Sequence, residues 1–276
     1  MESKHSKNEN DKKIDKYVFS LKSMIGQGAY ASVYLGRTIN TGESVAIKVI
    51  DKKIFANQYN LKNIHLEIDI MKKVQHENIV RLLDVYQTSN NMYIVTEYCE
   101  GGDLSNLLKK KKRLSEREAS IYLGQIISAF QYLVERDITH RDLKPANILL
   151  KDGCCKVSDF GFAKNLEDGD STIMRSIVGT PLYMSPQILS RMKYTNKSDL
   201  WSVGLIYYEM MHGCTPWPAK NEIQLINNIM SRPIGFETTV SDRSRDFIRG
   251  CLKVKEEDRI SWEEAFNHPL IRPVKK

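Results

Sequence analysis

The chain has 276 residues, 41% hydrophobic and 27% charged, with a formal net charge of +7, which is typical of a soluble globular protein of one large or two small domains. It contains no apolar run of the roughly 18 residues that a membrane span needs and no signal-peptide core at the N-terminus. The five cysteines form no C-x-x-C pair, which argues against a disulfide framework or a zinc cluster and favours a cytoplasmic location, with access to the nucleus.

The first part of the chain predicts a small lobe built mainly of strands. Residues 1–15 are mostly polar, so we expect a disordered N-terminal arm. From Tyr17 to Ile50, short apolar runs alternate with glycine-containing turns, which predicts three strands. Two more strands are expected around Val80–Tyr86 and Met92–Glu97. Between these groups, helical spacing of apolar residues predicts one helix, which carries Leu61, Ile64, Ile68 and Met71.

Gly101-Gly102 marks the expected boundary between two lobes, and the pattern beyond it is helical. Glu116–Arg136 has one broad apolar face, whereas Leu200–Met211 is apolar on nearly all sides, as expected of a buried helix. A small hairpin is predicted around Asp152-Gly153. Three further helices are expected near Ile223–Met230, Arg245–Leu252 and Trp262–Phe266. The predicted fold class is α+β.

The net charge does not by itself indicate a nucleic-acid partner. The charges of the first 15 residues balance, and the densest basic cluster is Lys109–Arg113, where a helix is expected to end. Cations are favoured there by the helix dipole. We interpret the cluster as a solvated helix end, with docking of an acidic partner as the alternative, and expect no nucleic-acid partner and no membrane span.

The most informative stretch is His140–Asn147, HRDLKPAN, followed by the Asp-Phe-Gly of residues 159–161. A loop with three charged groups and a proline between apolar runs needs a chemical reason, and phosphoryl transfer supplies one. Asp142 can orient an incoming hydroxyl and accept its proton, and Lys144 can neutralise the moving phosphoryl group. Asn147 and Asp159 can hold Mg²⁺.

A glycine-rich turn, Ile25–Val33, lies between two predicted strands, and glycine lets the backbone approach phosphate oxygens closely. A Gly-x-Gly pattern alone is weak evidence. Its weight comes from Val45–Lys48, which follows on the third strand at the distance that lets Lys48 contact the α- and β-phosphates of a nucleotide.

Together these stretches resemble the catalytic domain of eukaryotic serine/threonine protein kinases over about residues 17–272. The resemblance implies a bilobal kinase domain at 16–272, with a small β-rich N-lobe (about 16–99) that carries one key helix and a larger helical C-lobe (about 100–272). ATP and Mg²⁺ are the implied cofactors, and proteins carrying Ser or Thr are the implied substrates. Three runs, Glu97–Leu104, Leu143–Leu150 and Asp159–Lys164, look most like the autophagy-initiating ULK group. A calmodulin-dependent-type kinase is the alternative.

The same resemblance assigns the nucleotide site. Glu67 is the expected ion-pair partner of Lys48, in preference to Asp69, which lies two residues on and points to nearly the opposite side of the helix. Backbone groups of Glu97 and Cys99 would bond the adenine edge. Asp103 would meet the ribose or cap a helix. The expected nucleotide-binding residues are Ile25, Gly26, Gly28, Val33, Ala46, Lys48, Glu97, Cys99, Asp103 and Leu149.

The resemblance also implies which amino acid is phosphorylated and how the activity is regulated. Lys144 and Thr180 fit the serine/threonine type rather than the tyrosine type. Ser176 is the expected activating phosphosite, modified by an upstream kinase or by autophosphorylation, and Arg141 is the cation that would receive its phosphate.

The chain departs from the family pattern at two positions, Ala31 in the glycine loop and Gln187 in place of a glutamate that would pair with a buried arginine, here Arg259. We expect either a less stable C-lobe or compensation for Gln187 by Asp258 or another acid. These departures keep a second class open, a pseudokinase acting as a scaffold. Asp199, an acid at the head of an apolar helix, is expected to brace the catalytic loop and therefore to need backbone donors.

Overall fold

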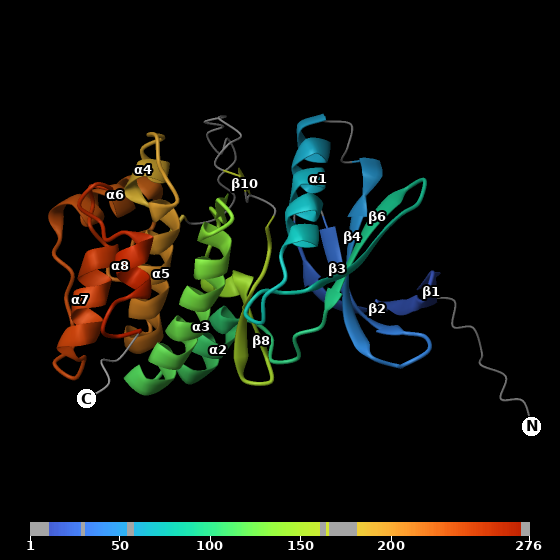
Figure 1. Cartoon of the computed structure of the whole chain (residues 1–276), viewed down its shortest axis with the longest axis horizontal. Coiled ribbons are helices and arrows are strands. Elements are labelled where there is room, and N and C mark those ends of the chain that lie inside the picture. Colours follow the sequence, from blue (N-terminus) through green and yellow to red (C-terminus); the bar gives the residue numbers. More distant parts are fainter. Residues whose placement is uncertain (1–10, 29–30, 54–57, 161–163, 166–180, 272–276) are drawn as a thin grey trace, which may run out of the picture. The chain divides into compact units, whose positions relative to one another are not determined.

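The computed structural model describes residues 11–28, 31–53, 58–160, 164–165 and 181–271. The chain divides into two compact units (Figure 1). The first comprises the chain up to Gln75 together with Val80–Glu100, and the second comprises His76–Ile79 and the chain from Gly101 onward. The division after Glu100 falls directly before the Gly-Gly pair, whereas the assignment of His76–Ile79 to the second unit has no counterpart in the sequence pattern.

The first unit holds one antiparallel sheet of six strands in the order β1-β2-β3-β4-β6-β5. Helix α1 (Gln58–Lys73) lies alongside the sheet (Figure 1). Strands β2 to β6 and the helix were predicted from the sequence and are confirmed. The strands are β1 (Asp11–Ile14), β2 (Tyr17–Gln27), β3 (Ala31–Thr38), β4 (Ser44–Asp51), β5 (Leu82–Gln87) and β6 (Asn91–Glu97).

The predicted arm of residues 1–15 was wrong for its last part, because Asp11–Ile14 forms β1 and pairs with β2. Residues 1–10 lie outside the described residues. The segment is too polar to read as a strand, but its backbone is paired by β2 and Ile14 packs against the core of the sheet. Tertiary contact therefore overrides the local composition.

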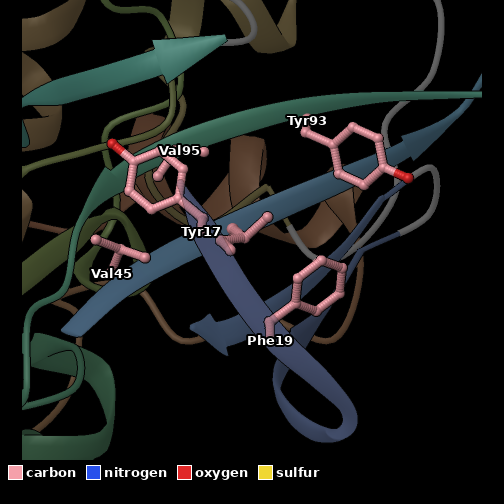
Figure 2. Packing of buried hydrophobic residues seen from close by; sticks show 6 residues of the cluster. Tyr17, Phe19, Val45, Tyr93 and Val95 are labelled. Atoms are coloured by element: carbon pink, nitrogen blue, oxygen red, sulfur yellow. The ribbon is translucent and has the colours of Figure 1, made fainter. Parts of the chain in front are cut away.

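One hydrophobic cluster of the first unit gathers side chains from three strands of the sheet (Figure 2). Strand residues two positions apart point to the same face, and neighbouring strands supply such pairs. Burying each large apolar side chain contributes roughly 1.5–3 kcal/mol, so this cluster holds β2, β4 and β6 together. Its buried members are Tyr17, Phe19, Val45, Ile47, Tyr93 and Val95.

The second unit is mainly helical, and the α+β class is confirmed. The helices expected from periodicity are present, as is α2, whose end was expected at the basic cluster, and α4 is an additional short helix. The helices are α2 (Leu104–Lys111), α3 (Glu116–Val134), α4 (Pro186–Leu189), α5 (Lys197–His212), α6 (Glu222–Ser231), α7 (Asp242–Cys251) and α8 (Trp262–Phe266). Two small sheets pair β7 (Ile138–Thr139) with β10 (Lys164–Asn165), and β8 (Ile148–Lys151) with β9 (Cys154–Val157).

Helix α5 is the centre of this unit, with thirteen of its sixteen residues buried. Its all-round apolar sequence predicted this placement. Gly204 lets α7 come close, since a Cβ there would lie 2.6 Å from the Cβ of Cys251. Among the described residues, no helix combines the length and the hydropathy that crossing a membrane requires.

The basic cluster at the end of α2 is partly neutralised within the chain. Lys111 pairs with Glu118 at 2.9 Å, and Arg113 makes two bonds to the Glu237 carboxylate, at 2.8 and 3.1 Å. The helix ends at Lys111, as predicted. These contacts support the interpretation of the cluster as a helix end with solvated and paired cations.

His76 predicts a pH dependence of stability. Its Nδ1 accepts a hydrogen bond from the Asn78 N–H (3.1 Å), and its ring packs on Tyr132. Burial is the main cause that lowers the pKa of His76 from its ordinary value. Because a lowered histidine pKa means that the unfolded chain takes up the proton first, stability should fall as the pH drops below about 6.5. Denaturant midpoints between pH 5 and 8 should show this slope, and His76→Gln should flatten it. An equal slope in both proteins would contradict the prediction.

Candidate active site

The catalytic loop follows β7 in the second unit and brings three of the predicted residues together. Lys144 Nζ lies 2.7 Å from Asp142 Oδ2. The Asn147 side-chain nitrogen donates to the Asp142 carbonyl at 2.8 Å and to Asp142 Oδ2 at 3.1 Å. Pro145 starts the short 3₁₀ turn Pro145–Asn147 that carries Asn147 back to Asp142. The Asp142 side chain remains 15% exposed, so a hydroxyl group could reach it.

Asp199 braces this loop from the first turn of α5. Its two carboxylate oxygens accept the backbone N–H of His140 at 2.8 Å and of Arg141 at 2.9 Å. Arg141 has the left-handed φ of 70°, a strained conformation that such bonds stabilise. Burial raises the pKa of Asp199, and the two backbone donors act against that shift. The expected need for backbone donors is confirmed.

The loop is also tied to the strand that leads to Asp159. His140 Nε2 lies 3.0 Å from the Ser158 carbonyl, and the His140 ring packs on Phe160 with centroids 5.2 Å apart. Asp159 itself is exposed, with a φ of 65°. The next residue, Gly161, lies outside the described range.

The donor atoms near the loop fit a magnesium ion bound partly by substrate. The Asn147 nitrogen donates to Asp142, so its amide oxygen is the atom available as a ligand. With the Asp159 carboxylate this gives hard oxygen donors, which Mg²⁺ prefers, completed by phosphate and water. Among the described residues, no group of three or more His, Cys, Asp or Glu is placed to hold a metal ion.

In the first unit, Lys48 on β4 pairs with Glu67 on α1. The Nζ–Oε1 distance is 2.7 Å, and the Glu67 side chain is 6% exposed. Asp69, the rival acid, is exposed. The ion pair expected from the sequence is therefore present with Glu67 as the partner, and its contribution to catalysis stays a prediction.

The glycine turn has a feature that the fold alone does not explain. A Cβ at Gly26 or Gly28 would meet its nearest neighbour at 3.7 or 3.6 Å, which is ordinary contact, and neither residue has a positive φ. The described structure thus tolerates a side chain at both positions. Close approach of a ligand, such as a phosphate group, would give glycine a reason here. The tip of the turn, residues 29 and 30, lies outside the described residues.

The remaining nucleotide-binding candidates lie in both units. Val33 and Ala46 are half-buried on β3 and β4, and Ile25 is exposed near the end of β2. Cys99 is buried. The Glu97 N–H already donates to the Arg81 carbonyl at 3.0 Å, so that N–H is not available to an adenine.

Asp103 and Leu149 belong to the second unit and form a β-bridge with each other. The Asp103 side chain caps α2, accepting the Asn106 N–H at 2.8 Å. The capping alternative is therefore observed, and the ribose contact stays a prediction.

Gln187 compensates for the missing glutamate in a way that the sequence did not reveal. Its Oε1 accepts from Arg259 at 3.0 Å while its Nε2 donates to the Val254 carbonyl at 2.7 Å. Arg259 is fully buried, and burial lowers its pKa to about 10. The carboxylate near it is Glu256, at 3.9 Å. Of the expected alternatives, Asp258 is exposed, and another acid, Glu256, lies near Arg259 instead.

Removing this carboxylate should destabilise the second unit. Glu256→Gln is expected to lower the free energy of unfolding by about 1–3 kcal/mol, because the buried Arg259 then keeps only neutral acceptors. Asp258→Asn is the matched control and should cost under about 0.5 kcal/mol. Urea titrations of the two variants test the assignment, which fails if Asp258→Asn proves the more destabilising.

The regulatory residues are only partly described. The Arg141 guanidinium lies over the Tyr194 ring at 5.5 Å, and its buried Nε has no hydrogen-bond partner among the described residues. Ser176 and Thr180 lie outside the described residues, so their predicted roles stay predictions.

Comparison with known proteins completes the picture of the site. The family model for the protein kinase domain matches residues 19–271. Relatives include the serine/threonine-protein kinase atg1 of Dictyostelium discoideum, 39% identical over 94% of this chain, and serine/threonine-protein kinase 36 of Pongo abelii, 39% identical over 90%. The human serine/threonine-protein kinase ULK1 is 36% identical over 94%. The chain spans 40%, 19% and 26% of these relatives, respectively.

Proposed function

This chain belongs to the protein kinase family, and on that premise we propose that it transfers the γ-phosphoryl group of ATP to Ser or Thr hydroxyls of protein substrates. The observation that carries the proposal is that the Lys144 and Asn147 side chains both lie within hydrogen-bond distance of Asp142 Oδ2. The residues whose loss defines many pseudokinases are all present in the sequence, which disfavours the scaffold alternative.

Each residue has a defined task in this proposal. Asp142 orients the substrate hydroxyl and accepts its proton, and Lys144 neutralises charge on the transferred group. Lys48, oriented by Glu67, would bind the α- and β-phosphates. Asn147 and Asp159 would hold Mg²⁺, which supplies charge neutralisation between the phosphates when bound.

Serine/threonine specificity is supported by Lys144, two residues after the catalytic aspartate, and by the names that the relatives carry. The proposal includes an ULK-like role in autophagy, since kinases named atg1 and ULK1 are among the relatives. A calmodulin-dependent-type kinase is not favoured. A cytoplasmic location agrees with five free cysteines. Activation by phosphorylation of Ser176, from an upstream kinase or from the protein itself, belongs to the same proposal.

The test is transfer of labelled phosphate from γ-labelled ATP to a generic protein substrate, with and without EDTA, followed by phosphoamino-acid analysis. Magnesium-restored labelling of Ser or Thr supports the proposal, and mass spectrometry of the protein itself shows whether Ser176 is modified. Labelling of tyrosine alone contradicts the specificity. Binding of ATP without transfer, even after treatment with an activating kinase, would support the scaffold.

A further inference from the structure

The turn between β1 and β2 reaches across to the far edge of the same sheet. Three consecutive residues, Asp15 and Lys16 of the turn and Tyr17 at the start of β2, contact β5 side chains. The Tyr17 hydroxyl donates to Asp84 Oδ2 at 2.5 Å, and Lys16 Nζ lies 3.0 Å from the same oxygen. The Tyr86 hydroxyl donates to Asp15 Oδ2 at 2.8 Å. Because β1 and β5 stand at opposite ends of the strand order, these contacts close the sheet on itself.

Apolar packing supports the same closure. Ile14 from β1 and both Leu83 and Tyr86 from β5 pack against the buried cluster of Figure 2, of which Tyr17 is a member. The rings of Tyr17 and Tyr86 meet edge to face with centroids 6.1 Å apart. The two edges therefore share one core as well as a set of polar contacts.

The backbone is adapted to make these contacts. The register of β5 against β6 shifts between Leu82 and Asp84, a bulge of the kind that re-aims a side chain. Asp15 adopts a left-handed φ of 50° in the two-residue turn that joins Ile14 to Tyr17. Aspartate is one of the few residues that tolerate this conformation. The conformation places the Asp15 carboxylate beside the Tyr86 hydroxyl.

This segment precedes the part of the chain that matches the kinase family, which begins at residue 19. Strand β5, in contrast, lies inside the match and contacts α1, the helix that carries Glu67. A path of direct contacts thus leads from the N-terminal turn through β5 to the helix that supplies the partner of Lys48.

We propose that the β1–β2 turn is a clasp, formed by Asp15, Lys16 and Tyr17 on Asp84 and Tyr86, that holds β5 and α1 in the position in which Glu67 pairs with Lys48. The clasp residues are positioning residues and touch no substrate. Whatever displaces the N-terminal segment would loosen α1 and lower activity. This inference rests on the proposed function for its catalytic consequence, but its structural consequence can be measured without any activity.

Hydrogen exchange followed by mass spectrometry on the whole chain tests it. Asp84→Ala should raise exchange in α1 and β5 by about tenfold, since it removes a charged acceptor with two donors. Asp84→Asn keeps an acceptor for Tyr17 and should give a smaller rise. Lys13→Ala, on the exposed side of β1, is the matched control and should change nothing in α1.

Strands β3 and β4 are the internal reference, because they lie in the same unit and neither pairs with β5. A rise confined to β1 would overturn the proposal, as would an equal rise in β3 and β4, which would report general loss of stability. Phosphate transfer, measured in parallel, should fall with the rise in α1 exchange. Altered α1 exchange with no transfer even in the unsubstituted protein would leave the clasp intact and contradict the proposed function instead.

Discussion

Asp142→Asn is expected to lower kcat for phosphate transfer by about 10²–10⁴-fold, the range that a positioned general base contributes. Asparagine preserves the shape of the side chain and can still accept the Lys144 bond that the structure shows at 2.7 Å. It cannot take a proton from the substrate hydroxyl. The loop geometry, held mainly by backbone bonds to Asp199, should persist.

The measurement is steady-state transfer from ATP to a protein substrate, with thermal unfolding midpoints for the same samples. The midpoint should change little, because Asp142 is partly exposed and the exchange is isosteric. Asp137→Asn, at an exposed position with a left-handed φ that asparagine tolerates, is the control and should retain full activity. An Asp142→Asn protein within threefold of normal activity would exclude Asp142 as the base.

Asp199→Ala is expected to give the largest loss of stability, about 2–5 kcal/mol. The substitution leaves two backbone N–H groups, those of His140 and Arg141, without an acceptor, and each unpaired buried group costs roughly 1–3 kcal/mol. It also removes the bonds that hold Arg141 at a φ of 70°. The catalytic loop should therefore lose order along with stability.

Urea unfolding of Asp199→Ala and Asp199→Asn separates the causes. Asparagine retains one carbonyl acceptor and removes the buried carboxylate, whose pKa is raised by burial. Asp199→Asn should therefore lower the free energy of unfolding by less than Asp199→Ala. Asp69→Ala, an exposed acid on α1, should stay within about 0.5 kcal/mol of the parent. Equal losses for the alanine and asparagine variants would show that the acceptor bonds are not the source of the effect.

Several features were predictable because local sequence determines them. The short apolar runs of β2, β4 and β6 predicted strands, and the all-round apolar sequence of α5 predicted a buried helix, since both patterns report burial directly. The catalytic loop was identifiable because its function requires particular side chains at fixed spacing. The resemblance assigned Glu67 as the partner of Lys48, and the geometry of a helix set Asp69 aside.

Other features depend on contacts between distant parts of the chain. Strand β1 is polar and short, and only pairing with β2 makes it a strand. Asp258 or another acid was expected near Arg259, and the structure exposes Asp258 and places Glu256 there. The sequence allowed two roles for Asp103, a ribose contact or a helix cap, and the structure shows the capping hydrogen bond from Asn106.

By itself the sequence determined the two-part organisation, the succession of the main strands and helices, and the chemistry of the site, because periodicity and short motifs are local properties. Only the tertiary structure decided which acid lies near Arg259, how Gln187 is accommodated, and that Asp15–Tyr17 meets β5. These three features depend on contacts between residues that are far apart in the sequence. Such contacts produce no hydrophobic periodicity in either segment, so sequence patterns do not report them.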